Sequence, residues 1–288
     1  MNSPARRALR LGALCVIAGE LLLAVMGALI KYLSPELGNS MIVFGRNALG
    51  LSILVPVLLV REGPGFLRTP HLRFHLMRGV IGVSAMYCYF FSLGKLTLTD
   101  AVLLKLTAPF FIPVIAFFWL GERTATITMA AIALGFCGVI VLLQPGQASP
   151  EDVFFVLAGV SGAVLGATAK VTIRRMGVKE PSARIVLYFA LVASAVSAPA
   201  ALMNWQWPTA LQWLLLLALA ATATAAQLLI TTAYRIAPAG AIGQFTYSSV
   251  LFAVLLGWLF FSEPLSLHQA VGGLLIVGAG LLNMRARG

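Results

Sequence analysis

AVLLKLTAPFFIPVIAFFWLGER, residues 101–123, is a mostly apolar run that ends in a Gly-Glu-Arg sequence. A similar run, IGQFTYSSVLFAVLLGWLFFSEP, lies at residues 242–264, and an offset of 141 places Glu122 opposite Glu263. An α-helix needs about 20 apolar residues to cross the hydrocarbon core of a bilayer. Each run therefore predicts a membrane span, and their shared pattern predicts that the chain contains two copies of one structural unit.

The composition excludes a soluble protein. Of the 288 residues, 60% are apolar and 10% are Asp, Glu, Lys or Arg, and the mean hydropathy is +0.96. Soluble domains contain about 45–50% apolar and about 25% charged residues. The apolar runs do not alternate polar and apolar residues as the strands of a membrane β-barrel do. The sequence therefore predicts an all-α integral membrane protein rather than a soluble, disordered or β-barrel protein.

Ten apolar runs have the length of a spanning helix. They lie near residues 12–33, 39–60, 77–95, 101–120, 127–143, 153–173, 184–203, 210–232, 239–261 and 266–283. Five spans fall in each half, which predicts repeats at residues 1–147 and 148–288. Because five is odd, the second repeat must enter the membrane inverted relative to the first, as in secondary transporters whose substrate site lies between the repeats.

The positions of the basic residues predict the orientation. If the N-terminus is cytoplasmic, fifteen of the twenty Lys and Arg residues fall on the inner side, and only Lys31 and Lys95 fall on the outer side. The remaining three, Arg46, Lys105 and Lys170, lie within spans. Cytoplasmic loops of membrane proteins are enriched in Lys and Arg. We therefore expect both termini in the cytoplasm, and we read the net charge of +11 as a topology signal rather than as a nucleic-acid site.

Motifs in both halves are similar to those of a known family. They are FGRNALGL (44–51), RGVIGVSAMYCYFFSL (78–93), TDAVLLKLTAPFFIPVIAFFWLGER (99–123), GFCGVIVLLQPG (135–146) and AIGQFTYSSVLFAVLLGWLFFSEPLS (241–266). Through them the chain resembles the drug/metabolite transporter superfamily in its ten-helix form, which has two EamA-type repeats. The second repeat departs from the usual pattern, because Val250 stands opposite Pro109 and helix seven has no counterpart of Arg46.

The resemblance implies a secondary transporter with a central cavity. Helices four and nine, together with helices one, three, six and eight, are expected to line the cavity, whereas helices five and ten lie further out. Members of the superfamily transport amino acids, nucleosides, vitamins, S-adenosylmethionine or drugs, and its bacterial members include amino-acid exporters, one of them specific for aromatic amino acids. The resemblance therefore specifies the family but not the substrate.

Charged groups inside the spans are candidates for the site, because each costs about 2.5–3.5 kcal/mol at the bilayer centre on insertion scales. Glu20 is the only acidic residue within an expected span. It could carry protons, or it could pair with a neighbouring helix or reach the membrane surface. Arg46 lies about 10 Å from the outer end of helix two. It could bind a substrate carboxylate or tie two helices together through backbone carbonyls.

Helix four combines a charge with a helix break. Residues 105, 109, 112 and 116 share one helical face. Pro109 has no N–H to donate to the carbonyl of Lys105, and Pro113 has none for the carbonyl of Pro109, so the helix should bend there. We therefore expect Lys105 and Pro109 in the binding and gating region. The alternative is a structural kink beside a lysine that reaches towards the membrane surface.

Aromatic and amide side chains complete the predicted substrate-binding set. They are Tyr87 and Phe90 on helix three, Gln227 on helix eight, and Gln244, Tyr247 and Ser248 on helix nine. Such a cavity suits a small amphipathic zwitterion and would equally suit a flat vitamin. A stripe of aromatic residues in a membrane span can also serve only for packing.

The sequence thus predicts a transporter of the bacterial inner membrane that exports amino acids by alternating access and needs no cofactor or metal. Uptake of S-adenosylmethionine or riboflavin is the alternative. A membrane enzyme or a channel is a weaker one. His71 and His75 have metal-binding spacing but no carboxylate between them, and no nucleotide-binding loop or nucleophile–base pair is evident. The expected partners are the lipid bilayer and a small-molecule substrate; monomer and homodimer both remain open.

Overall fold

A computed structural model of the protein describes residues 4–120, 126–143, 150–176, 180–236 and 243–285. Within these ranges the chain contains helices and turns but no strand. The helices of the first half are α1 (Pro4–Leu33), α2 (Asn39–Glu62), the short η1 (Pro64–Leu67), α3 (Leu72–Leu93), α4 (Leu98–Lys105), α5 (Ala108–Leu120) and α6 (Thr126–Leu143). Those of the second half are α7 (Pro150–Met176), α8 (Ser182–Met203), α9 (Ala210–Ile236), η2 (Gly243–Tyr247), α11 (Ser248–Phe261) and α12 (Leu267–Arg285).

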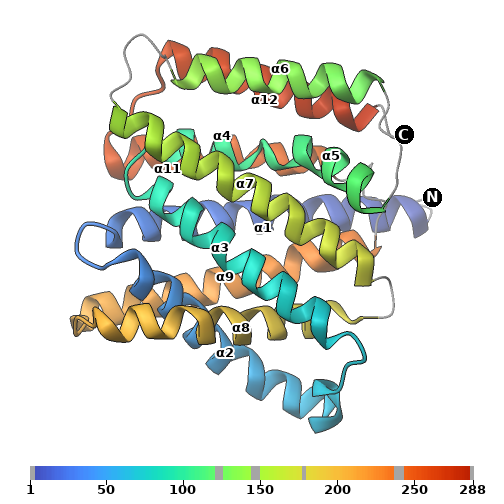
Figure 1. The fold of residues 1–288 in the computed structure, drawn as a ribbon, viewed down its shortest axis with the longest axis vertical. Helices are drawn as coiled ribbons and strands as arrows, with labels where there is room; N and C mark the ends of the chain where they lie inside the picture. The colour runs from blue at the N-terminus through green and yellow to red at the C-terminus, as the bar shows by residue number, and fades with distance from the viewer. Residues whose placement is uncertain (1–3, 121–125, 144–149, 177–179, 237–242, 286–288) are drawn as a thin grey trace.

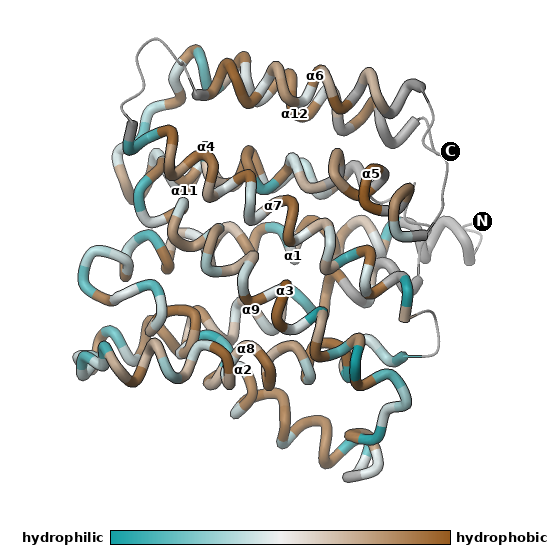
Figure 2. Tube along the Cα trace, in the orientation of Figure 1, coloured by the Kyte–Doolittle hydropathy of each residue, from teal (hydrophilic) through white to brown (hydrophobic). Residues whose placement is uncertain are grey.

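The helices have the apolar character of membrane spans (Figure 2). Among the described residues, seven helical stretches are long and apolar enough to cross a bilayer, with α4 and α5 counted together. Three shorter apolar stretches, Ile132–Leu142, Phe245–Phe261 and Leu267–Ala279, lie where the fifth, ninth and tenth spans are expected. The prediction of an all-helical membrane protein is therefore confirmed, whereas the number of spans stays a prediction.

The contacts between the two halves are symmetric: a contact between two helices has a counterpart between the equivalent helices of the opposite halves. The contact of α1 with α9 corresponds to that of α7 with α3. The contact of α2 with α9 corresponds to that of α8 with α3, and the contact of α1 with α11 corresponds to that of α7 with α5. The pairs α2 with α8 and α6 with α12 join counterparts, and the fourth and ninth spans meet through α4 and α11. This is the contact pattern expected of two repeats related by a two-fold axis. In Figure 1, α6 and α12 lie side by side at the edge of the bundle, where the family resemblance puts helices five and ten.

The helix of the fourth span is broken, and at the equivalent position of the second repeat a 3₁₀ turn passes directly into an α-helix. The expected continuous span 101–120 is divided at Leu106 and Thr107 into α4 and α5. The Thr107 hydroxyl donates to the Leu104 carbonyl at 2.6 Å, and Pro109 cannot supply an N–H to the carbonyl of Lys105. In the second repeat the 3₁₀ turn η2 ends at Tyr247 and α11 begins at Ser248, which the 141-residue offset aligns with Thr107.

The two ends of the described chain lie at the same end of the bundle. α1 begins and α12 ends at the same end (Figure 1), which we call the terminal end. α1 ends and α12 begins at the other end, which we call the opposite end. Between the two ends lies the main hydrophobic core, in which Ile30, Leu33, Leu98, Leu103 and Leu219 are fully or almost fully buried.

Candidate functional site

Glu20 and Lys105 form an ion pair between α1 and α4. The Glu20 Oε2 atom lies 3.7 Å from Lys105 Nζ, and the exposed fractions of the two side chains are 5% and 31%. This distance is too long for a hydrogen bond, so the pair is held by charge alone. Lys105 is the last residue of α4 and directly precedes the helix break. The sequence analysis selected both residues, and the structure brings them together.

Two further polar groups surround this pair. Tyr89 of α3 and Lys170 of α7 both interact electrostatically with Glu20 and Lys105. Lys170 is exposed and Lys105 is partly exposed, so the positive side of the cluster is accessible from outside the packed core while the carboxylate is not. Tyr89 was not among the predicted site residues, and Lys170 was placed within a span but not assigned to the site. Because these residues lie far apart in the sequence, no local sequence pattern indicates that they come together.

Arg46 and Gln227 meet in a second place, between α2, α8 and α9. They line a pocket of about 10 Å³ whose other lining residues include Asn47, Phe189 and Thr224. Arg46 is 7% exposed, and its Nη1 donates to Asn47 Oδ1 at 2.8 Å. The interpretation of Arg46 as a tie to backbone carbonyls finds no support among the described contacts, because its oxygen partner there is a side-chain amide.

Tyr247 and Ser248 lie in a third place. They line a groove of about 810 Å³ along α11 and α12, together with Thr99 and Gln269. Most of the lining is apolar, and Leu251 and Leu274, which also line it, are 72% and 74% exposed. In a membrane protein such leucines face the lipid. The groove therefore opens towards the bilayer and is separate from the Glu20–Lys105 pair.

The remaining predicted site residues are placed as follows. Phe90 is 3% exposed and belongs to the main core, and Tyr87 is partly buried against that core while its carbonyl accepts a hydrogen bond from Asn39. Pro109 lies in the first turn of α5, next to the break. Gln244 lies in η2, but its side chain is outside the described residues, as is Glu122. The binding roles of these residues stay predictions.

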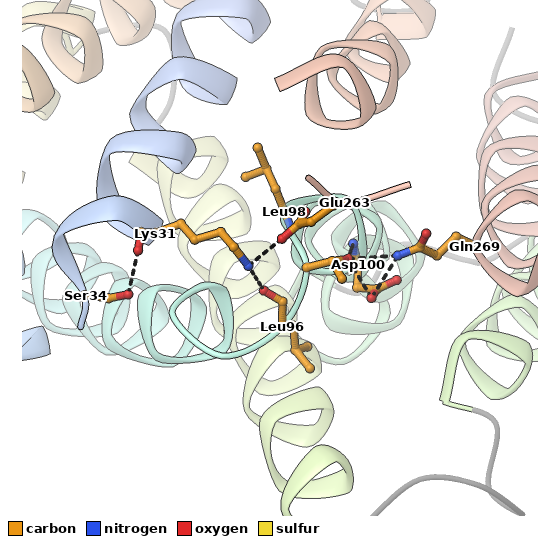
Figure 3. Close-up of polar contacts among 8 residues, drawn as sticks. Lys31, Ser34, Leu96, Leu98, Asp100, Glu263 and Gln269 are labelled. Carbon is orange, nitrogen blue, oxygen red and sulfur yellow. Dashed lines mark hydrogen bonds and ion pairs between the residues drawn. The ribbon is translucent and has the colours of Figure 1, made fainter. Parts of the chain in front are cut away.

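A polar cluster joins the repeats at the opposite end, and we call it the Lys31–Glu263 clasp (Figure 3). Lys31 Nζ lies 2.7 Å from Glu263 Oε1 and also donates to the Leu96 carbonyl. Glu263 Oε2 accepts the N–H of Leu98 at 2.9 Å, which is one of the free donors at the start of α4. The glutamate that revealed the repeat in the sequence therefore caps a helix of the other repeat.

Asp100 extends this clasp towards α12. Thr97 donates to Asp100 Oδ2 at 2.7 Å, while Gln269 Nε2 donates to Thr97 Oγ1 at 2.9 Å and to Asp100 Oδ2 at 3.2 Å. Figure 3 shows Gln269 approaching Asp100 from the side away from Glu263. The second repeat thus contacts the start of α4 from two of its elements.

A second cluster joins the repeats at the terminal end, and we call it the Glu180 clasp. Thr69 donates to Glu180 Oε1 at 2.6 Å, Arg184 donates to Oε2 at 3.1 Å, and His75 Nε2 lies 3.5 Å from the same oxygen. The Arg184 Nε also donates to the Phe66 carbonyl at 2.7 Å. Burial acts to raise the pKa of Glu180, but the hydrogen bonds from Thr69 and Arg184 and the nearby positive charge outweigh it, so the pKa lies below its usual value.

The sequence analysis missed this clasp and considered His75 only with His71. In the structure His75 is fully buried and stacks on Tyr188 at 4.6 Å between ring centroids, and its carboxylate neighbour comes from the other repeat. Among the described residues no group of three or more His, Cys, Asp and Glu side chains could hold a metal ion. The sequence feature that could have indicated the role of Glu180 is its position as a single acidic residue in an otherwise basic inner loop.

The chain is similar to known proteins in sequence and in fold. The EamA-like transporter family matches the chain twice, over residues 10–144 and 151–285. A solved crystal structure matches with a TM-score of 0.68 at 22% sequence identity over 97% of both chains. At that identity the likeness shows the fold.

Three proteins illustrate the range of relatives. The pseudopaline exporter CntI of Pseudomonas aeruginosa is 31% identical, over 97% of this chain and 98% of its own length. An S-adenosylmethionine uptake transporter of Rickettsia bellii is 27% identical, over 87% of this chain and 85% of its own. A riboflavin transporter of Brucella anthropi is 27% identical, over 85% of this chain and 87% of its own.

Proposed function

The chain belongs to the EamA-like transporter family of the drug/metabolite transporter superfamily, and from this membership we propose that it exports a small amino-acid-like metabolite across the bacterial inner membrane by alternating access. Its relatives move small metabolites in either direction. The most similar of the three relatives named above is an exporter and matches almost the whole of both chains, which favours export here. Uptake is the competing proposal, because two of those relatives are an uptake transporter for S-adenosylmethionine and a riboflavin transporter.

The proposed topology has ten spans, two inverted repeats and both termini in the cytoplasm. The start of α1 and the end of α12 lie at one end of the bundle (Figure 1), as an even number of spans requires. α3 and α8 begin at the terminal end (Figure 1), and their first turns contain Arg73 and Arg184, in keeping with the excess of basic residues on the cytoplasmic side of membrane proteins. The terminal end is therefore the cytoplasmic end in this proposal.

The two clasps support alternating access. Each joins residues of the first repeat to residues of the second, one at each end of the bundle. A transporter whose repeats rock against each other must open one end while the other stays closed. In this proposal the Lys31–Glu263 clasp closes the periplasmic side and the Glu180 clasp closes the cytoplasmic side, so that the cycle breaks them in turn.

The loose ion pair of Glu20 with Lys105 is the observation that carries the proposed substrate class. A pair held at 3.7 Å without a hydrogen bond can separate at low cost when better partners arrive. A zwitterion supplies both partners, since its ammonium group can bind Glu20 and its carboxylate can bind Lys105 with charge-assisted hydrogen bonds. The adjacent break in helix four supplies irregular backbone at membrane depth, which membrane proteins tolerate where it is buried in protein or lines a water-filled path.

Counterflow into proteoliposomes tests the proposal. We expect saturable exchange of at least one radiolabelled amino acid from a panel that includes aromatic amino acids, Met and Thr, and we expect Lys105→Ala and Gln244→Ala to impair it. Exchange of S-adenosylmethionine or riboflavin with no amino-acid exchange would overturn the substrate class but not the transporter. A current far faster than an alternating cycle permits would indicate a channel instead.

A further inference from the structure

Two arginines share one aromatic ring inside the membrane-spanning part of the bundle. Arg78 of α3 lies with its Cζ atom 4.0 Å from the centroid of the Phe189 ring, and Arg46 of α2 lies with its Cζ atom 5.7 Å from the same centroid. Their guanidinium groups are thus no further apart than these two distances together, and their like charges act on each other. Such a grouping of cations is costly in a membrane unless an anion joins it.

Neither arginine has a carboxylate partner among the described residues. The printed oxygen acceptor for Arg46 is the side chain of Asn47, its second contact is the thioether of Met86 at 3.6 Å, and its Nε is buried without a partner. The Nε and Nη1 atoms of Arg78 are also buried without a partner. A guanidinium carries five N–H donors and no acceptor. Most of the ten donors in this pair therefore lack an acceptor from the described part of the chain.

The direction of the Arg78 side chain is the second observation. Its Cα lies in the second turn of α3, near the terminal end, and long basic side chains in that position normally extend outwards to the membrane surface. Here Nη1 instead lies 2.9 Å from the position that a Cβ atom on Gly82 would occupy, one turn deeper in the span. Only a glycine at position 82 leaves room for Arg78 and Phe189 together. The enrichment of basic residues on the cytoplasmic side explains an arginine at this end of the bundle. It does not explain why the side chain of Arg78 turns inwards.

From these contacts we propose that Arg46 and Arg78 form a binding site for a second carboxylate group of the transported metabolite, in addition to the one that binds Lys105. This proposal deepens and rests on the proposed function. Arginine binds carboxylates through two parallel hydrogen bonds, which suits a site that must recognise a planar anion. Asn47, Thr224 and Gln227 lie beside Arg46 and offer further polar contacts to the same molecule.

The site is divided between the two repeats. Arg46, Asn47 and Arg78 belong to the first, and Phe189, Thr224 and Gln227 belong to the second (Figure 1 shows α2 and α3 beside α8 and α9). The pocket beside Arg46 measures about 10 Å³, which is room for about one water molecule. A carboxylate therefore fits only when α2 separates from α8 and α9, so binding at this site is coupled to the movement between the repeats.

Thermal unfolding of the full-length protein in detergent tests the site without requiring transport. The probes are citrate, succinate and glutamate, each compared with its neutral amide counterpart and with phosphate and chloride at equal ionic strength. We expect at least one carboxylate, but neither its amide nor phosphate, to raise the melting temperature of the wild type and of Arg73→Gln. Arg73 is an exposed arginine of the same helix and controls for the loss of one charge.

In Arg46→Gln and Arg78→Gln the apparent affinity for that carboxylate should fall at least tenfold. Arg78→Lys keeps the charge but not the paired donors, so its apparent affinity for the carboxylate should lie between those of the Gln variants and the wild type. It replaces Arg78→Gln in the test if that variant does not fold. Stabilisation by no carboxylate, an equal response to phosphate, or an unchanged response in both Arg78 variants would overturn the site. If proteoliposomes transport nothing while carboxylates still stabilise only the arginine-intact protein, the proposed function fails and the site stands.

Discussion

The carboxylate of Glu20 and the ammonium group of Lys105 face each other across 3.7 Å, from α1 and from the last residue of α4. Their separation exceeds hydrogen-bond distance, and the carboxylate is buried while the ammonium is partly exposed. Each charge stabilises the other in a region of low dielectric.

Removing either charge of the pair should slow transport. We expect Glu20→Gln and Lys105→Ala to lower the rate of counterflow at least tenfold, because a zwitterion loses a charge-assisted partner of about 1.5–3 kcal/mol. The matched controls are Glu36→Gln and Lys95→Gln, which remove the same charges from exposed positions. Wild-type rates in both site variants, with folded protein by gel filtration, would remove the pair from the transport site.

Glu20 should also control the response to pH. Transport by the wild type across pH 5–8 should change with pH if Glu20 exchanges a proton during the cycle, and Glu20→Gln should transport at a rate independent of pH. The groups that face Glu20 are Lys105, Tyr89 and Lys170, so Tyr89→Phe and Lys170→Gln are needed as controls. A variant profile that coincides with the wild-type profile would exclude Glu20 as a proton carrier.

The break in helix four should be needed for movement rather than for folding. Pro109→Ala supplies an N–H that can bond the Lys105 carbonyl and continue the helix. We expect a several-fold slower rate of counterflow together with an equal or higher melting temperature, which separates this effect from damage to the fold. A lower melting temperature with unchanged transport would show that the break serves stability instead.

The opposite-end clasp should show coupling in a double-mutant cycle. With Lys31→Met and Glu263→Gln, we expect an interaction energy on the order of 1–3 kcal/mol in the free energy of unfolding, because both side chains are mostly buried and 2.7 Å apart. Chemical denaturation of the four proteins measures it. Additive losses within about 0.5 kcal/mol would mean that the ion pair is replaced by water or by other partners when one member is removed.

The terminal-end clasp should make stability depend on pH with a defined sign. The pKa of Glu180 is lower in the folded protein than its usual value, so the unfolded chain takes up its proton first as pH falls. The contribution of Glu180 is therefore complete above about pH 5 and is lost as pH falls through about 4 and below. Glu180→Gln should lower the free energy of unfolding by about 3 kcal/mol at pH 7.

The same variant should approach the wild type in acid. Thermal unfolding of the two proteins between pH 3.5 and 7 measures the difference, and Glu151→Gln, at an exposed position at the start of α7, is the control. A difference that stays constant over this range would contradict the assignment of Glu180 as the titrating group.

The sequence predicted the class of fold because bilayer thickness fixes the length of an apolar span, and the 141-residue offset predicted the internal repeat. It also predicted a bend beside Pro109, since the missing N–H acts locally. It did not predict the 3₁₀ turn η2 before α11, because no proline marks that point. η2 contacts α1 and α12, which lie outside the segment.

The candidate site was predictable only in part. Glu20, Arg46 and Lys105 stood out singly because charges are rare in spans, but no local pattern tells which of them pair. Arg78 was assigned to the inner surface by the same rule that predicts the orientation of the whole chain from its basic loops. Its inward turn depends on Gly82 and on Phe189 from the other repeat, and such contacts follow from tertiary packing alone.

Counterflow in proteoliposomes that contain the wild type, Glu20→Gln or Glu36→Gln tests the central claim most directly. Vesicles loaded with unlabelled amino acids take up labelled ones only if the protein exchanges them across the membrane. The proposed function predicts saturable uptake by the wild type and by Glu36→Gln and at least tenfold slower uptake by Glu20→Gln. Equal uptake by all three proteins, or no uptake of any amino acid by the wild type, would contradict it.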